Sequence, residues 1–225
     1  MSVRIVVRER GVTDSPDDLA ILDDDERARA GRKREAAPFV TGHALVRRVL
    51  GELLDRDPAG LTFARRCTTC GSERHGKPSL RDVADWHFSL SYTSASAIVA
   101  VAEGVEVGVD IEELTDADFE GFAGATLARD EVTGFDGLDG HDLLVARARV
   151  WARKEAVLKA TGRGLVVDPS EVLVSGPRDP ARLVDWRADE PGPPMISLAD
   201  VDPTTPDHRA AVAALTGDDL RVEAV

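Results

Sequence analysis

Two carboxylates near the middle of the chain have a spacing that could support chemistry. The run from Val105 to Ile111 alternates around β-branched residues, which predicts a strand. Side chains two apart on a strand share a face, so Asp110 and Glu112 should point away from Val109 and Ile111. Carboxylates crowded on one face repel each other unless a positive charge lies between them. The alternative is a polar strand end on which both acids are solvated.

A third carboxylate, Glu155, lies on a predicted amphipathic helix that ends at Gly162. The inward stripe of this helix would consist of Leu144, Ala148, Trp151, Glu155 and Leu158, which recur at steps of four and three. A carboxylate on such a stripe is costly unless a cation meets it. Lys159 lies one turn further on and could pair with Glu155, an interpretation that requires no ligand.

Taken together, Asp110, Glu112 and Glu155 predict a metal site. Sparse carboxylate ligation suits magnesium, which keeps several waters and takes other ligands from substrate phosphates. In that interpretation, Lys154 and Lys159 become partners of those phosphates.

The two motifs resemble the signature of a known family. Val-Gly-Val-Asp-Ile-Glu ends at Glu112, and Trp-x-x-Lys-Glu-x-x-x-Lys-x-x-Gly-x-Gly-Leu follows from Trp151 to Leu165. In this order the pair is similar to the signature of Sfp-type 4'-phosphopantetheinyl transferases. The resemblance covers most of the chain, from the helix that begins at Phe39 to Leu165.

The resemblance implies magnesium-dependent transfer of 4'-phosphopantetheine from coenzyme A to a serine of an apo acyl or peptidyl carrier protein. Asp110, Glu112 and Glu155 would hold the magnesium, and Lys159 and Lys154 would bind the pyrophosphate. Glu155 or a metal-bound water would deprotonate the serine. The products would be holo carrier protein and 3',5'-adenosine bisphosphate.

Two weaker family features precede the signature. Gly76, Lys77 and Pro78 form a predicted turn in which glycine permits close backbone approach and lysine supplies a point charge. The resemblance places this turn in the coenzyme A pocket, beside Ser91 and Tyr92 on the next strand. Where the family usually has a histidine, Tyr92 can donate a hydrogen bond but carries no positive charge.

The resemblance also gives a role to a basic cluster in this acidic chain. Arg32-Lys33-Arg34 could be solvated surface. In the family, however, basic residues here contact the 3'-phosphate of coenzyme A, which makes Arg32 and Arg34 candidates. Relatives often carry an arginine near Pro38, where this chain has a neutral residue.

The remaining pattern predicts an α+β fold. A helix from Phe39 to Leu54 would turn Arg47 and Arg48 outward. Short helices and loops are expected between Glu113 and Gly140. The predicted strands are Val3 to Val7, Trp86 to Ser91, Ser96 to Glu103, Leu165 to Val174, Ala181 to Trp186, Met195 to Val201 and Arg209 to Leu215.

The expected organisation is two halves, each with a small sheet and a long helix. We place the N-terminal half, with coenzyme A contacts, at residues 1–105, and the C-terminal half, with the metal site, at 106–225. A pseudo-twofold relation between the halves is implied by the resemblance alone.

Composition limits the classes of protein and partner. The net charge of −13 over 225 residues argues against nucleic acid as a general partner. No signal peptide or membrane-length apolar run is visible, so we expect a cytoplasmic monomer. The pair Cys67 and Cys70, with His75 nearby, resembles half a zinc knuckle. Because a structural zinc site wants four ligands, the sequence favours a reduced, loop-bound pair, and a strained local disulfide is a further alternative.

Two other functions would use the same residues. A non-catalytic scaffold that binds coenzyme A or a carrier protein is motivated by Tyr92 and Pro38, and opposed by the intact carboxylates and lysines. A magnesium-dependent hydrolase of a nucleotide diphosphate would use water as nucleophile. It would need a water-positioning base, to which no residue in the sequence points.

Overall fold

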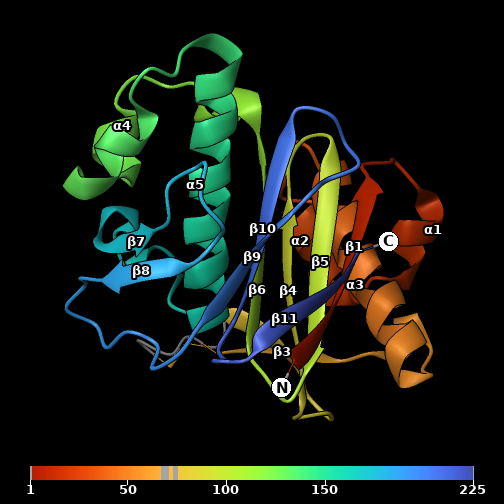
Figure 1. Cartoon of the computed structure of the whole chain (residues 1–225). Coiled ribbons are helices and arrows are strands. Elements are labelled where there is room, and N and C mark those ends of the chain that lie inside the picture. Colours follow the sequence, from red (N-terminus) through yellow and green to blue (C-terminus); the bar gives the residue numbers. More distant parts are fainter. Residues whose placement is uncertain (1, 67–70, 73–75, 225) are drawn as a thin grey trace.

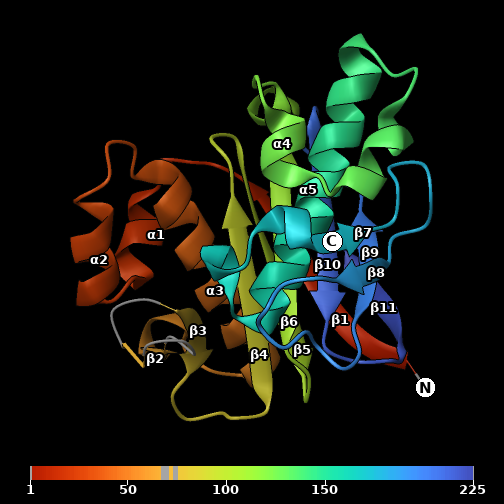
Figure 2. The same cartoon turned by 90° about the vertical axis from the view of Figure 1, so that its left-hand side faces the viewer.

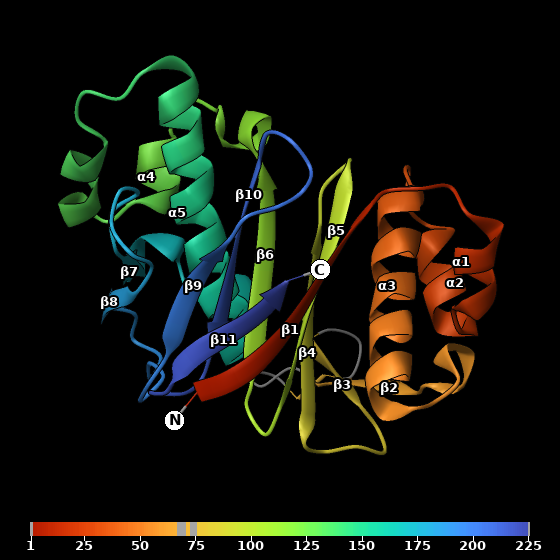
Figure 3. The ribbon, with the colours of Figure 1, turned by 45° about the vertical axis from the view of Figure 1, so that its right-hand side comes forward.

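The computed structural model describes residues 2–66, 71–72 and 76–224. Two sheets face each other, and a long helix covers the outer face of each (Figures 1 and 3). The resulting layers are α5, sheet, sheet and α3. This arrangement confirms the predicted α+β fold of two halves, each with a sheet and a long helix.

The N-terminal sheet has the strand order β11-β1-β5-β4. Its strands are β1 (Ser2–Gly11), β4 (Trp86–Tyr92), β5 (Ser96–Glu103) and β11 (Asp219–Ala224). The pairs β1–β5 and β4–β5 are antiparallel, whereas β1–β11 is parallel. The helices of this half are α1 (Pro16–Ile21), α2 (Asp24–Ala30) and α3 (Ala37–Leu54), and a small ribbon joins β2 (Phe63–Arg66) to β3 (Lys77–Leu80).

The C-terminal sheet has the antiparallel order β6-β10-β9. Its strands are β6 (Val107–Glu113), β9 (Ser197–Val201) and β10 (His208–Ala214). Helix α5 (Gly140–Thr161) covers this sheet and ends where Gly162 adopts a left-handed conformation, a common helix terminus. The hairpin of β7 (Val172–Val174) and β8 (Leu183–Trp186) packs against α5, and α4 (Phe122–Thr126) lies near its N-terminal part (Figure 2).

Alternating small and branched residues build the layers. Along β5, Ile98 and Ala100 face the other sheet, while Val99 and Val101 face α3. A strand buried on both faces reads as a continuous apolar run, as the sequence of β5 does. The same division applies to β10, which presents alanines to α5.

The edges of the two sheets meet at β4 and β6. The backbone N–H of Val109 donates to Ser89 Oγ at 3.1 Å, which joins the strands without a regular ladder. Gly108 lies directly beneath α5, and a Cβ at this position would collide with Ala156 O and Ala160 N. Only glycine allows the strand to approach the helix this closely.

Several expectations need correction. The predicted strand from Leu165 to Val174 consists mostly of short 3-10 turns, and only Val172–Val174 is extended. Strand β11 was not expected. It lies in the C-terminal half by sequence but pairs with β1 in the N-terminal sheet. The division of the chain near residue 105 stays a prediction. If it holds, β11 is the strand that the C-terminal half contributes to the N-terminal sheet. Among the described residues, no helix has the length and hydropathy needed to cross a bilayer.

Candidate active site

The structure brings Asp110, on β6, together with Lys159, on α5, and Ser91, on β4. Lys159 Nζ lies 2.6 Å from Asp110 Oδ1 and 2.9 Å from Ser91 Oγ. The Ser91 hydroxyl donates to the same Asp110 oxygen at 2.8 Å. Lys159 therefore pairs with the strand carboxylate rather than with Glu155, so the predicted pair within the helix is not the contact observed among the described residues.

Glu112 and Glu155 complete a group that we call the carboxylate cluster, Asp110, Glu112 and Glu155. Burial, followed by the charge of Asp110, raises the pKa of Glu112 to about 9. The same two causes raise the pKa of Glu155 to about 7, against the opposing charge of Lys159. The three acids thus act on one another, as predicted from the shared face of Asp110 and Glu112.

The chemistry of these residues fits a bound divalent cation. Within the described ranges, no three His, Cys, Asp or Glu side chains already lie in an arrangement that could hold a metal ion. Asp110 Oδ2 and Glu155 Oε1, however, are both buried and have no hydrogen-bond partner among the residues that the structure describes. Unpaired buried oxygens are costly, and a hard cation would satisfy them with the oxygen ligands that magnesium prefers.

Lys154 does not contribute to this site, which corrects the expectation that it binds phosphate. Its ammonium is buried and lies 2.6 Å from Glu131 Oε2, 2.9 Å from Pro169 O and 2.7 Å from Val172 O. Three acceptors match the three protons that a lysine donates. Lys154 thus holds the segments around Glu131 and β7 against α5.

Lys77 joins the two halves. Its Nζ lies 2.5 Å from Glu106 Oε2 and 2.8 Å from Val107 O, and His87 Nδ1 lies 3.1 Å from the other Glu106 oxygen. Burial alone would raise the pKa of Glu106, but His87 and Lys77 outweigh it and hold the pKa at about 2. Lys77 also lines a pocket of about 230 Å³ with Glu106 and His87.

A larger pocket opens in the N-terminal half. We call it the arginine pocket. Its volume is about 580 Å³, and it is lined by Arg29, Arg32, Arg65 and Arg81, by the acids Asp23, Asp25 and Glu26, and by apolar residues that include Phe63 and Pro78. Of the predicted coenzyme A contacts, Arg32 and Pro78 line it. Pro78 also lines the smaller pocket, so the two spaces are neighbours.

The other predicted contacts lie elsewhere. Arg34 is exposed outside the two pockets, and Gly76 immediately precedes β3 with a positive φ of 110°. Tyr92 is half-buried, and its ring meets Phe39 edge-on at 6.4 Å. Cys67, Cys70 and His75 lie outside the described residues, so the zinc question stays open.

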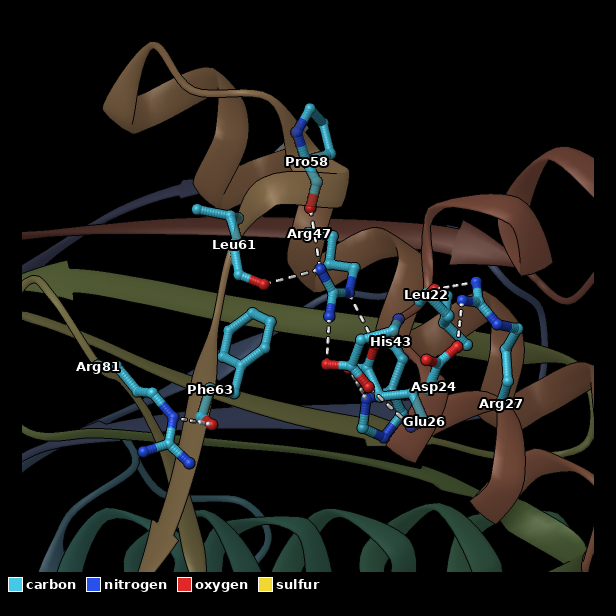
Figure 4. Close-up of polar contacts among 11 residues, drawn as sticks. Leu22, Asp24, Glu26, Arg27, His43, Arg47, Pro58, Leu61, Phe63 and Arg81 are labelled. Atoms are coloured by element: carbon cyan, nitrogen blue, oxygen red, sulfur yellow. Dashed lines mark hydrogen bonds and ion pairs between the residues drawn. The ribbon is translucent and has the colours of Figure 1, made fainter.

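One wall of the arginine pocket is held by a buried ion-pair network that the sequence did not reveal. Arg47, predicted to point outward, is fully buried instead. It donates to Glu26 Oε2 and Asp23 Oδ2, both at 2.7 Å, and to Pro58 O and Leu61 O, both at 3.0 Å (Figure 4). Because these acceptors satisfy its N–H groups and balance its charge, the Arg47 guanidinium can be buried.

His43 extends the same network. Its Nδ1 lies 3.0 Å from Glu26 Oε1, and its ring stacks on Phe39 with centroids 4.0 Å apart. Burial lowers the pKa of His43, whereas His43 and Arg47 together keep the pKa of Glu26 low despite its burial. His43 and Arg47 are four residues apart on α3, and this helical spacing is the signal that could have indicated a shared face.

Known proteins match this chain over most of its length. A family model for the 4'-phosphopantetheinyl transferase superfamily matches residues 106–213. The chain is 30% identical to 4'-phosphopantetheinyl transferase HetI of Nostoc sp. over 171 residues, which cover 73% of this chain and 69% of HetI.

Two relatives from Bacillus extend the comparison. The identity to 4'-phosphopantetheinyl transferase psf-1 of Bacillus pumilus is 28%, over 63% of this chain and 58% of that protein. For 4'-phosphopantetheinyl transferase Sfp of Bacillus subtilis it is 23%, over 82% of this chain and 80% of Sfp. The chain belongs to the Sfp-type 4'-phosphopantetheinyl transferase family.

Proposed function

We propose that this protein transfers 4'-phosphopantetheine from coenzyme A to the serine hydroxyl of an apo acyl or peptidyl carrier protein. The observation that carries the proposal is the convergence of Asp110, Glu112, Glu155 and Lys159 at the seam between the halves. Family membership supports this reaction class. The serine oxygen attacks the β-phosphorus, and 3',5'-adenosine bisphosphate leaves.

The carboxylate cluster would hold a magnesium ion, whose charge would offset negative charge on the pyrophosphate. Asp110 and Glu155 offer the unpaired oxygens, and Glu112 lies beside them. Lys159 is 28% exposed at its side chain, so its ammonium can reach a phosphate oxygen as well as Asp110. Such charge-assisted contacts strengthen as negative charge develops on the leaving group.

Glu155 is also positioned to take the serine proton. Its second carboxylate oxygen would remain available to accept a proton, as a general base does. Strand β4 lies between the carboxylate cluster and the arginine pocket. Its residue Ser91 contacts Asp110, and the preceding residue, Leu90, lines the pocket. Coenzyme A would place its adenosine 3',5'-bisphosphate portion among the arginines.

The test is an intact-mass assay with coenzyme A, magnesium and a panel of apo carrier proteins. We expect a carrier to gain the mass of one phosphopantetheine, with the adenosine bisphosphate released. Omitting the carrier should leave coenzyme A intact. Hydrolysis of coenzyme A without any carrier would instead favour the nucleotide diphosphate hydrolase, and binding without turnover on every carrier would favour the scaffold. Cytoplasmic location, a monomeric state and the absence of nucleic-acid partners stay predictions.

A further inference from the structure

Lys77 begins β3, and its ammonium group contacts the two elements that carry the carboxylate cluster. Nζ lies 2.5 Å from Glu106 Oε2 and 2.8 Å from Val107 O, where β6 begins, and 3.3 Å from Ala160 O, near the end of α5. We call this arrangement the lysine clamp. Its three acceptors match the three protons of an ammonium group, and the Lys77 side chain is 17% exposed. Lys77 thus donates all of its protons within the protein.

The contact with Ala160 closes the C-terminal end of α5. The last carbonyl groups of a helix have no partner inside the helix, and the helix dipole favours a cation beside them. Lys159 O accepts from the backbone N–H of Gly162, and Ala160 O accepts from Lys77. A Cβ at Gly162 would lie 3.8 Å from Lys77 Cβ and Cδ, so the methylene groups of the lysine also pack against the helix end. Lys77 therefore fixes the turn of α5 that carries Lys159.

The contact with Glu106 fixes the start of β6. Glu106 lies four residues before Asp110, on the face of β6 where Gly108 contacts α5. His87, on β4, lies 3.1 Å from the second Glu106 oxygen, so this carboxylate is held from two strands of the N-terminal half. The lysine clamp therefore lies at one end of the contact between β6 and α5, and the carboxylate cluster lies further along the same two elements.

The ribbon that carries Lys77 also forms part of the arginine pocket. Pro78, the next residue, lines that pocket and is the register partner of Arg65 on β2. Arg65 Nη1 donates to Gly76 O at 3.2 Å across the same ribbon. Any shift of the ribbon relative to β6 would therefore move one wall of the pocket relative to the carboxylate cluster.

On the basis of the proposed function, we propose that Lys77 is a positioning residue, which holds the wall of the arginine pocket in a fixed place relative to Asp110 and Lys159. It acts through the lysine clamp and not by binding a phosphate of coenzyme A. Transfer requires the pyrophosphate to lie within reach of the carboxylate cluster while the adenosine end occupies the pocket. A misplacement of about 1 Å can lower a rate by about a hundredfold.

The variant Glu106→Ala separates the two roles of Lys77, because they predict opposite results. If Lys77 bound a phosphate, removing the carboxylate that competes for it would leave coenzyme A binding unchanged or make it tighter. For a positioning residue, we expect Glu106→Ala to weaken coenzyme A binding by about threefold or more and to lower the kcat of transfer by about tenfold. Calorimetry in the presence of magnesium and initial transfer rates measure these quantities. Glu103→Ala, exposed at the end of β5, is the matched control.

Binding of adenosine 3',5'-bisphosphate separates damage to the pocket from a change in its placement. This compound should occupy the arginine pocket without reaching the carboxylate cluster. Its affinity should therefore change by less than about twofold in Glu106→Ala, because the lysine clamp does not contact it. Retained binding also shows that the variant is folded. An equal loss of affinity for this compound and for coenzyme A would overturn the assignment.

Variants of Lys77 itself test the same role. Lys77→Met should lower kcat by about ten- to a hundredfold, and adding Glu106→Ala should lower it little further, because both changes open one clamp. Lys77→Arg keeps a cation that can reach Glu106, so it should retain most of the rate. Additive losses in the double variant, or equal losses in Lys77→Arg and Lys77→Met, would show that Lys77 does not act through Glu106.

The proposed function fails by a different result. If Glu106→Ala weakens binding of coenzyme A but not of adenosine 3',5'-bisphosphate, yet no apo carrier gains mass with the wild type, the assignment of Lys77 stands and transfer does not. If the wild type modifies a carrier but Glu106→Ala binds coenzyme A at least as tightly as the wild type, the assignment of Lys77 alone is wrong.

Discussion

The two long helices contact their sheets in different ways. On α5, the strand backbone at Gly108 touches the helix backbone at Ala156 and Ala160, with no space for a Cβ. On α3, a Cβ at Gly42 would meet Leu90 Cδ1 at 3.0 Å and Tyr92 Cδ1 at 3.1 Å, which are ends of side chains. In the C-terminal half, helix and strand backbones are in contact, so no side chain between them can move to accommodate a change. In the N-terminal half, side chains separate the helix from the sheet.

This difference matches what each half holds. The carboxylate cluster spans β6 and α5, so a fixed distance between strand and helix sets the spacing of Asp110 and Glu155. Catalytic groups on rigid elements keep their geometry better than groups on loops. The N-terminal half instead has room for the arginine pocket beside α3.

The largest effect is expected from changing Glu155, the buried carboxylate that α5 contributes to the carboxylate cluster. Glu155→Gln should lower the transfer rate on the order of a thousandfold or more, about 4 kcal/mol, because a metal ligand and a proton acceptor are lost together. The melting temperature should not fall, since Glu155 Oε1 is buried without a partner. Glu52→Gln, on the exposed face of α3, is the matched control. Normal turnover of Glu155→Gln after metal removal would eliminate the carboxylate cluster as the site.

Two lysines on α5 should separate stability from activity. Lys154→Met removes the cation beside buried Glu131, which keeps only the backbone N–H donors of Ala128 and Val174 among the described residues, and should cost about 3 kcal/mol of unfolding free energy. Lys159→Ala should cost less stability than Lys154→Met, because the Lys159 side chain is 28% exposed and Ser91 still donates to Asp110. It should cost about ten- to a hundredfold in transfer rate, because a phosphate contact is lost. Denaturant unfolding and initial rates on both variants check the contrast. A stable and fully active Lys159→Ala protein would exclude Lys159 from the site.

The helix contacts themselves can be compared by adding a single methyl group. Gly108→Ala should destabilise the protein by about 3 kcal/mol or more, because backbone atoms of α5 cannot move aside locally. Gly42→Ala should change stability by less than about 1 kcal/mol, since the gain in helix propensity offsets a small shift of Leu90 and Tyr92. Urea unfolding of both variants measures the difference. Equal effects would mean that the two helices contact their sheets in the same way.

The smallest effect concerns Glu106, which joins the halves through Lys77. Because its pKa is lowered to about 2, Glu106 contributes stability that is present above the ordinary carboxyl pKa of 4.5. That contribution should be lost as the pH falls from about 4.5 to about 2. Unfolding at several pH values should show a steeper loss in the wild type than in Glu106→Gln. Parallel pH profiles would mean that the Lys77–Glu106 contact adds nothing to folding.

Sequence patterns predicted the parts of this fold that local periodicity determines. The strand containing Asp110, the helix ending at Gly162 and the shared face of Asp110 and Glu112 follow from steps of two and of three to four. The placement of Lys159 beside Asp110 was not predictable this way, because it depends on how α5 crosses β6. The predicted metal site of three carboxylates linked these two elements, and the family resemblance supported that link.

The surroundings of three basic residues differ most from what the sequence predicts. Arg47 and Lys154 look like surface residues by type, yet partners distant in sequence, such as Glu26 and Glu131, make their burial favourable. Arg65, which Arg66 follows on a four-residue strand, lies in no periodic pattern that would indicate its surroundings. Only the ribbon that turns β2 toward α2 brings it near Arg29. Charged groups inside a protein are set by tertiary contacts, which a single sequence does not display.

The pairing of β1 with β11 has a consequence for synthesis of the chain. Ser2 and Asp219 are register partners, so one edge of β1 has no neighbour until residue 224 has been made. At ordinary translation rates, roughly 10 to 40 s separate completion of the two strands. During that interval β5 can occupy the other edge of β1, while the open edge is free to pair with strands of other chains. Nascent chains should therefore depend on chaperones most strongly just before β11 emerges from the ribosome.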